Sequence, residues 1–354
     1  MQKIALIYGG ESSEHSVSCV TAVGVLGAID QSKYEVIPIG ITPKGKFVLH
    51  EIDSNWKLAD NPKIPESAPE IRLPIGGGNL IGPSGESFGE IELAFPVLHG
   101  PNGEDGSMQG LLQLCHIPFV GNGVLASAVA MDKTKAKAVF RDAGITVARQ
   151  IDVSRNYFAR QRSQVLEQVA REFQVPFFVK PARSGSSVGV SMVKDLSELE
   201  SALELALSHD QTALVEERII GREVECSVLQ LPNGELKVSL AGEIIVTTGD
   251  FYDYEAKYLG GGADLKVPTT LSAAELSEMQ DLAKRAFTAL GCTGLARTDF
   301  FLTESGFVLT EVNTMPGFTP ISMYPALWQA SGVSYQELIE TLIQTGLALG
   351  TQPR

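Results

Sequence analysis

Cysteine is scarce in this sequence, and long apolar runs are missing from it. The four cysteines (Cys19, Cys115, Cys226 and Cys292) are widely scattered, and each has apolar neighbours. Because neither a disulfide framework nor a zinc site has such spacing, we expect reduced core residues of a cytoplasmic protein. No apolar run approaches the roughly 18 residues of a membrane span, and the first run, 4–8, is too short for a signal peptide.

Basic residues are in deficit as well. The chain has 28 lysines and arginines against 42 aspartates and glutamates, a formal net charge of −14, and no basic cluster. Such a surface repels phosphate backbones and anionic lipids, which excludes a general nucleic-acid or membrane-binding function. With 354 residues, 44% hydrophobic and 20% charged, the composition is typical of a globular protein of two or three domains.

The N-terminal part predicts a parallel sheet. A β-rich run is followed by a helical stretch over 16–29 and by a second strand over 34–41, which is a βαβ unit. Prolines and glycines cluster between residues 61 and 89, where we expect a long insertion with short strands. Further elements complete this unit near residue 122, namely strand 92–98, helix 107–115 and strand 117–120.

Beyond residue 122 the pattern changes to an α+β type, so the fold class is α/β together with α+β. A single helix is predicted over 124–142, ending at Gly144. The next elements are strands 148–152, 177–179, 191–193 and 213–217 with a helix over 197–208. The remainder is predicted as strands 224–231 and 237–243, a polar aromatic loop at 250–262, a helix at 273–290, a hairpin at 295–312 and a helix at 335–349.

Two familiar phosphate-loop patterns are close but incomplete. Residues 40–46 have the glycine and lysine spacing of a Walker A loop, but Phe47 stands where a serine or threonine must meet Mg²⁺. Residues 121–126 have the glycine spacing of a dinucleotide fingerprint between a strand and a helix. The acidic residue that follows, Asp142, falls at a helix end and not at the tip of a second strand. We interpret the first pattern as a turn and reject the second as an NAD site.

A loop of small residues follows a strand that ends in a lysine. Residues 180–189 are Lys-Pro-Ala-Arg-Ser-Gly-Ser-Ser-Val-Gly. Free backbone N–H groups and hydroxyls in such a loop can cover a polyphosphate, and Lys180 adds a cation. The alternative is a mobile surface loop without a ligand.

The predicted hairpin carries the strongest chemical pattern. If it folds symmetrically about Ser305, Asp299 lies opposite Glu311. Arg297 then lies opposite Asn313, and the period of two puts all four side chains on one face. Two opposed carboxylates repel each other unless a cation lies between them. Carboxylate and amide oxygens are the ligands of Mg²⁺ when it also holds substrate phosphates, so the hairpin predicts a magnesium site.

A solvated strand face without a ligand is the alternative for this hairpin. The symmetric pairing places Phe301 beside Leu309 on the same face as an apolar patch, which argues against a solvated face. Arg297, next to the metal, could stabilise a developing oxyanion charge.

Acidic and aromatic segments supply further candidates. Glu216 and Glu217 end the strand at 213–217, and Glu223 follows shortly after. A carboxylate at these positions can accept a hydrogen bond from a ribose hydroxyl or an adenine amino group. The alternative is that the acidic pair is simply solvated, as such pairs at strand ends usually are. The aromatic stretch 252–258 predicts a lid or a packed surface loop. His99 begins a glycine-rich loop after a strand, where α/β sheets bind ligands, but a lone histidine there is more often structural.

Together these segments resemble the D-alanine–D-alanine ligase family of ATP-grasp enzymes. The resemblance runs through ordered blocks over nearly the whole chain, at 9–18, 99–110, 131–133, 180–189, 216–223, 252–258, 297–299 and 311–317. It implies a three-domain ATP-grasp architecture with an N-terminal Rossmann-like parallel-sheet domain. The expected divisions are an N-terminal α/β substrate-binding domain at 1–125, a central α+β ATP-grasp subdomain at 126–220, and a C-terminal ATP-grasp domain with the metal site and lid loop at 221–354.

The resemblance also implies the roles of the site residues. ATP would be bound through its phosphates by Lys133 and Lys180, at the adenine by Glu216 and Ile219, and at the ribose by Glu223, with Ser187 and Glu217 in the same set. Two Mg²⁺ ions, for which Mn²⁺ can substitute, would be held by Asp299, Glu311 and Asn313. These are the residues that the hairpin argument selects independently.

Substrate and lid residues follow from the same resemblance. Glu14 would hold the ammonium group of the first D-alanine, with His99 in the same substrate-binding set. Arg297 and the loop around Gly317 would face the acyl phosphate and the tetrahedral intermediate, and Ser322 and Met323 would contact the second carboxylate. Lys257 would reach the γ-phosphate, while Tyr258, Ser186 and Glu14 would form a hydrogen-bonded set that closes the lid.

The implied activity is ATP-dependent synthesis of D-alanyl-D-alanine for peptidoglycan, by a homodimer in a bacterial cytoplasm. Ligation of D-alanine to D-serine or D-lactate is the nearest alternative, and Tyr258 argues against D-lactate. Another ATP-grasp carboxylate–amine ligase would keep the metal ligands but need not keep Glu14 or the 252–258 loop. A non-catalytic nucleotide-binding regulator and an NAD-dependent oxidoreductase are alternatives from other classes.

Overall fold

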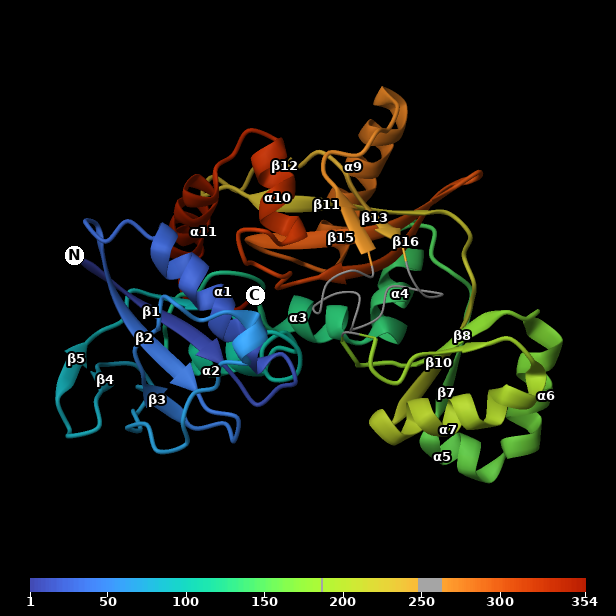
Figure 1. Cartoon of the computed structure of the whole chain (residues 1–354), viewed down its shortest axis with the longest axis horizontal. Helices are drawn as coiled ribbons and strands as arrows, with labels where there is room; N and C mark the ends of the chain where they lie inside the picture. The colour runs from blue at the N-terminus through green and yellow to red at the C-terminus, as the bar shows by residue number, and fades with distance from the viewer. Residues whose placement is uncertain (186, 248–262) are drawn as a thin grey trace.

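The computed structural model describes residues 1–185, 187–247 and 263–354. These residues form three sheets of four or more strands and one small two-stranded sheet. The first sheet (blue) and the second sheet (green to yellow-green) lie at opposite ends of the molecule, and the third (yellow to orange) lies between them in the upper part of the view (Figure 1). This mixed α/β and α+β architecture confirms the predicted fold class.

The first sheet is built around β1 (Gln2–Gly9) in the order β3-β2-β1-β6. β1 pairs in parallel with both β2 and β6, as the βαβ pattern predicts, whereas β3 pairs antiparallel with β2 at the edge. The residues from Ile4 to Gly9 are all buried, as expected for a parallel strand covered on both faces. The other elements are β2 (Tyr34–Ile41), β3 (Phe47–Leu49), β6 (Leu93–Pro96), α1 (His15–Ala28) and α2 (Ser107–Leu114).

The predicted insertion with short strands is confirmed. It contains the 3₁₀ helix η1 (Leu58–Asp60) and the antiparallel pair β4 (Leu80–Ile81) and β5 (Ser87–Gly89). His15 joins it to the first sheet, because its Nε2 accepts from the Ile64 N–H at 3.1 Å and its Nδ1 bonds the Gly10 carbonyl at 2.7 Å.

The C-terminal helices return to the first sheet. Helix α11 (Tyr335–Leu349) begins with a capping box in which Ser334 and Glu337 bond each other's backbone N–H groups. It packs against α1 and β6, and α10 (Met323–Ala330) packs against α11 and β11 (Arg222–Gln230); residues of these elements share one hydrophobic core with β1. The core includes Ile4, Leu6, Phe318, Tyr324, Trp328, Leu338, Ile339, Leu342 and Ile343. The last residues of the chain therefore complete the core of the first unit.

The second sheet is antiparallel, in the order β7-β10-β8-β9. Its helices cover one face and share a core with it, which includes Phe177, Val179, Leu203 and Val215. The elements are β7 (Gln150–Ser154), β8 (Phe177–Pro181), β9 (Ser191–Val193), β10 (Thr212–Glu217), α5 (Arg155–Arg160), α6 (Arg162–Glu172), η2 (Leu196–Glu198) and α7 (Leu199–His209).

The third sheet is also antiparallel, in the order β14-β13-β11-β15-β16, with β12 paired to β11. Helix α9 (Ala273–Ala289), which starts with a capping box at Ser272, and helix α4 pack on one face, so the opposite face is left for a site. The strands are β11 (Arg222–Gln230), β12 (Leu236–Val238), β13 (Gly242–Val246), β14 (Ala263–Lys266), β15 (Leu295–Thr303) and β16 (Gly306–Asn313).

Several predicted elements were wrong in detail. The helix over 124–142 is two helices, α3 (Val124–Met131) and α4 (Lys133–Asp142), because Asp132 is extended and caps α4 through its side chain. Residues 117–120 form no strand, only a bridge from Phe119 to Ala94. The strand over 237–243 is split between β12 and β13, and helices α5, α6 and α10 were not predicted.

The hairpin pairs as predicted but for a different reason. Thr303 pairs with Gly306, so the turn is centred between Glu304 and Ser305 and not on Ser305. A bulge at residue 310 then shifts the register, which brings Asp299 opposite Glu311 after all. The shift also changes the apolar face. Leu309 pairs with Phe300 in the buried core, and the predicted pair of Leu309 with Phe301 was wrong.

The cysteines and the helices agree with the composition. All four cysteines are buried and free, so the expected reduced state is what the structure contains. Within the described ranges, no helix has the length and apolar character that a membrane crossing requires.

Candidate active site

A cavity of about 560 Å³ is lined by residues of the second and third sheets and by residues of α1 and of the loops next to the first sheet. Every predicted site residue in the described part of the chain lines it, although no local pattern joins them in sequence. They are Glu14, His99, Lys133, Lys180, Ser187, Glu216, Glu217, Ile219, Glu223, Arg297, Asp299, Glu311, Asn313, Gly317, Ser322 and Met323. Ser186, Lys257 and Tyr258, with the 250–262 loop, lie outside the described residues.

A charged cluster covers the open face of the third sheet. Arg297 binds Asp299 with two hydrogen bonds of 2.8 Å, and its Nε lies 2.9 Å from an oxygen of Glu225 on β11. Asn313 donates to Asp299 at 2.8 Å. Burial alone would lower the pKa of Arg297, but the two carboxylates raise it well above its ordinary value. A cation therefore lies beside Asp299 and Glu225, and Glu311 adds to the negative field around it.

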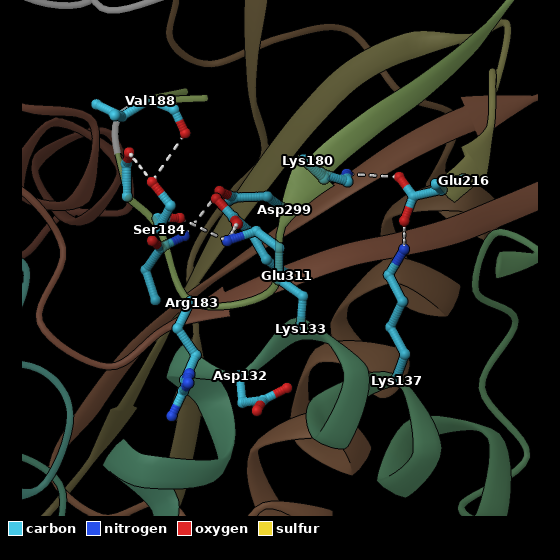
Figure 2. A network of polar contacts seen from close by, with 12 residues as sticks. Asp132, Lys133, Lys137, Lys180, Arg183, Ser184, Val188, Glu216, Asp299 and Glu311 are labelled. Atoms are coloured by element: carbon cyan, nitrogen blue, oxygen red, sulfur yellow. Dashed lines mark hydrogen bonds and ion pairs between the residues drawn. The ribbon is translucent and has the colours of Figure 1, made fainter. Parts of the chain in front are cut away.

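Lys133 connects this cluster to the second sheet. As the first residue of α4, it donates to the Ser184 carbonyl at 2.9 Å, and its ammonium lies 3.6 Å from Glu311 (Figure 2). A lysine at the positive end of a helix is electrostatically unfavourable in isolation. The acidic hairpin provides the compensating charge.

Lys180 and Glu216 form a second charged group on the second sheet. Lys180 on β8 is the diagonal neighbour of Glu216 on β10, and the two are 2.6 Å apart (Figure 2). Burial and the nearby charge of Lys133 lower the pKa of Lys180 to about 8. This lysine is thus poorly solvated and well suited to bind an anionic ligand.

The small-residue loop between β8 and β9 is anchored at its base. Arg183 donates to Asp210 through its backbone and side chain, at 2.7 Å for each of the two shortest bonds. Ser184 donates to the Val188 carbonyl at 2.9 Å, and Ser187 has a positive φ of 60°. Ser184, Gly185 and Ser187 of this loop line the cavity together with Lys180.

Glu217 differs from the other acidic candidates. Alternation along β10 turns it away from Glu216. Its carboxylate accepts from the backbone and the side chain of Arg149, at 2.8 and 2.9 Å. Glu223, at the start of β11, lies on the same face of the third sheet as Asp299. Its side chain therefore reaches the cavity from the third sheet, whereas Glu216 reaches it from the second.

The first sheet contributes Glu14 and His99. Glu14 is buried at the start of α1, and its carboxylate lies against Gly100 and Gly185, so it reaches the loop of the second sheet. His99 is buried, its Nδ1 lies 3.3 Å from the Met315 carbonyl, and burial lowers its pKa. A neutral imidazole thus connects the first sheet to the loop that follows β16.

Glu104 is a half-buried acid that sequence reasoning did not select. Its carboxylate accepts from the Gly100 N–H at 2.6 Å. Burial, reinforced by the charge of Glu14, raises the pKa of Glu104 to about 8, so this side chain is mostly protonated at neutral pH. Protonation of Glu104 removes one negative charge from the surroundings of Glu14.

The loop after β16 leads into an open helix N-terminus. Ser322 is the N-cap of α10, but its hydroxyl bonds Thr319, at 2.7 Å to the hydroxyl and 3.1 Å to the N–H, and does not cap the helix. The N–H groups of Met323 and Tyr324 are thereby left for an anion, since Pro325 has no N–H and the Ala326 N–H donates to the Ser322 carbonyl. Gly317 packs against Ser322, since a Cβ at this glycine would lie 3.2 Å from the serine Oγ.

The two incomplete phosphate-loop patterns have structural roles. Residues 40–46 form the turn between β2 and β3. Asn122 is buried and donates to the carbonyls of Leu295 and Thr314 at 2.7 and 2.8 Å, while its Oδ1 accepts from the Thr293 N–H at 2.9 Å. The NAD-like segment therefore ties α3 to the base of the hairpin.

Asp299, Glu311 and Asn313 fit a magnesium site by their chemistry. They are two carboxylates and an amide on one face, and cationic side chains already occupy the spaces beside them. Across residues 1–185, 187–247 and 263–354, no group of three or more His, Cys, Asp or Glu side chains has a metal-binding arrangement. A metal here would complete its shell with substrate oxygens, as Mg²⁺ does at phosphate sites.

Three residues that sequence reasoning missed belong to this site. Lys137 follows Lys133 by one helical turn, and Glu225 follows Glu223 by two residues on β11, so the helical and strand periods could have identified both. Glu104 had no comparable signal, because only the fold buries it.

The fold and the site define the class of protein. Two antiparallel sheets enclose a cavity lined with lysines on one side and with metal-type ligands on the other, as in ATP-grasp enzymes. Models of the "D-ala D-ala ligase N-terminus" and "D-ala D-ala ligase C-terminus" match residues 3–122 and 139–344. The chain belongs to the D-alanine–D-alanine ligase family.

Individual relatives agree with this assignment. The chain is 44% identical to the D-alanine–D-alanine ligases of Mycolicibacterium smegmatis and Nocardia farcinica, covering 99% of this chain in each case and 96% and 98% of the relatives. Among solved structures, the VanG D-Ala:D-Ser ligase of Enterococcus faecalis has a TM-score of 0.86 at 36% identity, over 98% of this chain and 99% of that one. The D-alanine–D-alanine ligase of Coxiella burnetii has a TM-score of 0.82 at 33% identity, over 98% and 94%.

Proposed function

We propose that this protein joins two D-alanine molecules into D-alanyl-D-alanine at the expense of ATP, for peptidoglycan synthesis. The observation that supports the proposal is that one cavity is lined together by Glu14, by Lys133 and Lys180, and by Asp299, Glu311 and Asn313 of the hairpin. Family membership supports the same reaction. The reaction needs all of these groups at once, because a carboxylate is a poor electrophile until it is phosphorylated.

The lysines and the second sheet are proposed to bind the nucleotide. Lys133 and Lys180 would bind the phosphates, and the loop at Ser187 would cover them with backbone N–H groups. Glu216 and Ile219 would contact the adenine, and Glu223 the ribose. The low pKa of Lys180 supports this role, because an anionic phosphate restores the charge that burial disfavours.

The hairpin is proposed to hold two magnesium ions. Asp299, Glu311 and Asn313 would be the ligands, and Mn²⁺ can substitute. When bound, the metal neutralises charge on the transferring phosphoryl group. Arg297, fixed by Asp299 and Glu225, keeps its own charge next to that group without further reorganisation.

The two amino-acid sites are proposed on either side of the phosphates. Glu14 would bind the ammonium group of the first D-alanine, and His99 would line the same part of the cavity. The open N-terminus of α10, with Ser322 and Met323, would bind the carboxylate of the second. Gly317 would leave room for the acyl phosphate and the tetrahedral intermediate. Ser186, Lys257 and Tyr258 remain predictions for lid closure.

Turnover with defined substrates tests this function. We expect phosphate release from ATP with Mg²⁺ to depend on D-alanine but not L-alanine, and mass spectrometry to find the dipeptide. Asp299→Asn and Glu311→Gln should abolish turnover, whereas Asn55→Ala, an exposed residue far from the cavity lining, should not. Absence of ATP hydrolysis with every amino acid tested would contradict the proposal.

A D-serine acceptor is the second candidate. The support is the printed activity of the VanG relative, whose fold matches this chain with a TM-score of 0.86. The same assay with D-alanine and D-serine together separates the two candidate activities. An excess of D-alanyl-D-serine over D-alanyl-D-alanine would favour the D-serine acceptor. We also propose a homodimer in the cytoplasm and the domain divisions 1–125, 126–220 and 221–354.

A further inference from the structure

Three charged side chains from different elements meet beside the nucleotide cavity. Glu216 on β10 contacts Lys180 on β8 through Oε1 at 2.6 Å, and through Oε2 it forms an ion pair with Lys137 of α4. Figure 2 shows the glutamate between the two lysines. Each carboxylate oxygen thus has its own cation.

Lys137 is the unusual member of this group. Its side chain is only 1% exposed, whereas Lys180 is 15% exposed and reaches the cavity. Lys137 does not line the cavity, so it is not placed to touch a ligand there. Across the described ranges, the one ion pair of Lys137 is with Glu216.

Burying this lysine has a cost that packing alone does not explain. Burial, with the charges of Lys180 and Lys133, lowers the pKa of Lys137. The carboxylate of Glu216 lies in direct contact with this amine, and an opposite charge at contact distance favours the ammonium form. A leucine or methionine would fill this space in the core without such a penalty, so the charge itself has a use.

The use becomes apparent when the nucleotide is considered. In the described structure Lys180 is engaged by Glu216, but under the proposed function it must bind phosphate. If Lys180 moves to the phosphate, Oε1 of Glu216 loses its partner inside a buried site. Lys137 cannot follow, because it is enclosed, and so it remains with Oε2.

We propose that Lys137 is a positioning residue that keeps Glu216 ionised and oriented, so that Lys180 can be exchanged for the exocyclic amine of adenine at Oε1. The inference rests on the proposed ATP dependence and adds to it a determinant of base specificity. A carboxylate accepts from the amine of adenine but repels the carbonyl oxygen that guanine has at the same position. Lys137 thus acts on the base through Glu216 and without touching the nucleotide.

Equilibrium binding of ADP and GDP, measured by calorimetry on the full chain with Mg²⁺, tests the proposal. Lys137→Met should weaken ADP binding about tenfold and leave GDP binding nearly unchanged, which reduces the preference for adenine. Lys135→Met is the matched control on the same helix, because Lys135 is exposed, and it should leave both affinities unchanged. Lys137→Arg, which keeps the charge, should restore part of the ADP affinity.

A double-mutant cycle separates positioning from simple packing. Glu216→Gln should also weaken ADP binding, and adding Lys137→Met to it should change the affinity by less than about twofold, since Lys137 then has nothing to orient. The double variant removes both members of the Lys137–Glu216 ion pair, so neither of the two is left without the other. It is therefore the variant on which the measurement rests if Lys137→Met alone fails to fold.

Each outcome decides the question. An unchanged ADP-to-GDP preference in folded Lys137→Met would overturn the inference and leave the proposed function intact. Independent, multiplicative effects of the two substitutions would also overturn it. If the wild-type chain binds neither nucleotide, the proposed function itself fails, and this inference fails with it.

Discussion

Asn122→Ala is expected to destabilise the protein strongly, because one side chain satisfies three buried backbone groups. The amide donates to the carbonyls of Leu295 and Thr314 and accepts from the Thr293 N–H, all within 2.9 Å. Asn122 is 2% exposed, so water cannot readily replace these bonds. An unsatisfied buried group costs about 1–3 kcal/mol, so three such groups give a loss of roughly 3–9 kcal/mol in the free energy of unfolding.

Urea unfolding followed by tryptophan fluorescence measures this loss, since Trp328 lies in the core that includes Leu295. Asn55→Ala is the control, because this asparagine is exposed and bonds only a neighbouring aspartate, and it should change stability by less than about 0.5 kcal/mol. Because Thr314 begins the loop that leads to Gly317, we also expect a higher KM for D-alanine. A free energy of unfolding within 1 kcal/mol of wild type for Asn122→Ala would refute the reasoning.

Two further predictions follow from ionisation. The pKa of Lys180 is lowered to about 8, so the affinity for ADP should fall by up to tenfold per pH unit above pH 8. The Lys180→Arg variant should bind ADP with little change between pH 7 and 9. A wild-type affinity that does not change with pH would contradict this prediction. The pKa of Glu104 is raised to about 8, so the folded state binds more protons than the unfolded state between its ordinary value and pH 8, and stability falls as pH rises through that window. Glu104→Gln should remove this fall in thermal unfolding curves, and an unchanged pH dependence would exclude Glu104 as its source.

The hairpin illustrates what alternation along a strand can and cannot predict. The pattern correctly placed Asp299 opposite Glu311, but the assumed turn was wrong by half a residue. Without the bulge at residue 310, Glu311 would face the core and the metal ligands would be divided between two faces. Hydrophobic alternation does not report a bulge, so the predicted pairing was correct because the bulge offset the error in the assumed turn centre.

Features set by local chemistry could be predicted from the sequence, whereas features set by long-range packing could not. The break at Asp132 was readable, since an aspartate before a run of helix formers is an N-cap signal. The packing of α11 next to the first sheet could not be predicted from the sequence. An apolar helix face can pack against any apolar surface, and only the folded core determines which surface it meets. That packing places Met315 next to His99, and therefore determines which residues of distant segments share the cavity.

The contact between Glu14 and the loop at Gly100 yields a last prediction, which concerns substrate rather than nucleotide. Gly100 has a φ of +74°, and a Cβ there would lie 2.9 Å from Oε2 of Glu14 and 3.0 Å from Oγ of Ser12. Gly100→Ala should therefore cost about 1–2 kcal/mol in backbone strain and push the Glu14 carboxylate from its position. We expect the KM for D-alanine to rise severalfold while ADP affinity stays within twofold, because Glu14 is proposed to bind the amino acid only. Gly27→Ala is the matched control, since this exposed glycine near the end of α1 has open space around it and alanine favours the helix. Equal losses of D-alanine and ADP binding in Gly100→Ala would show that Glu14 does not act on the amino acid alone.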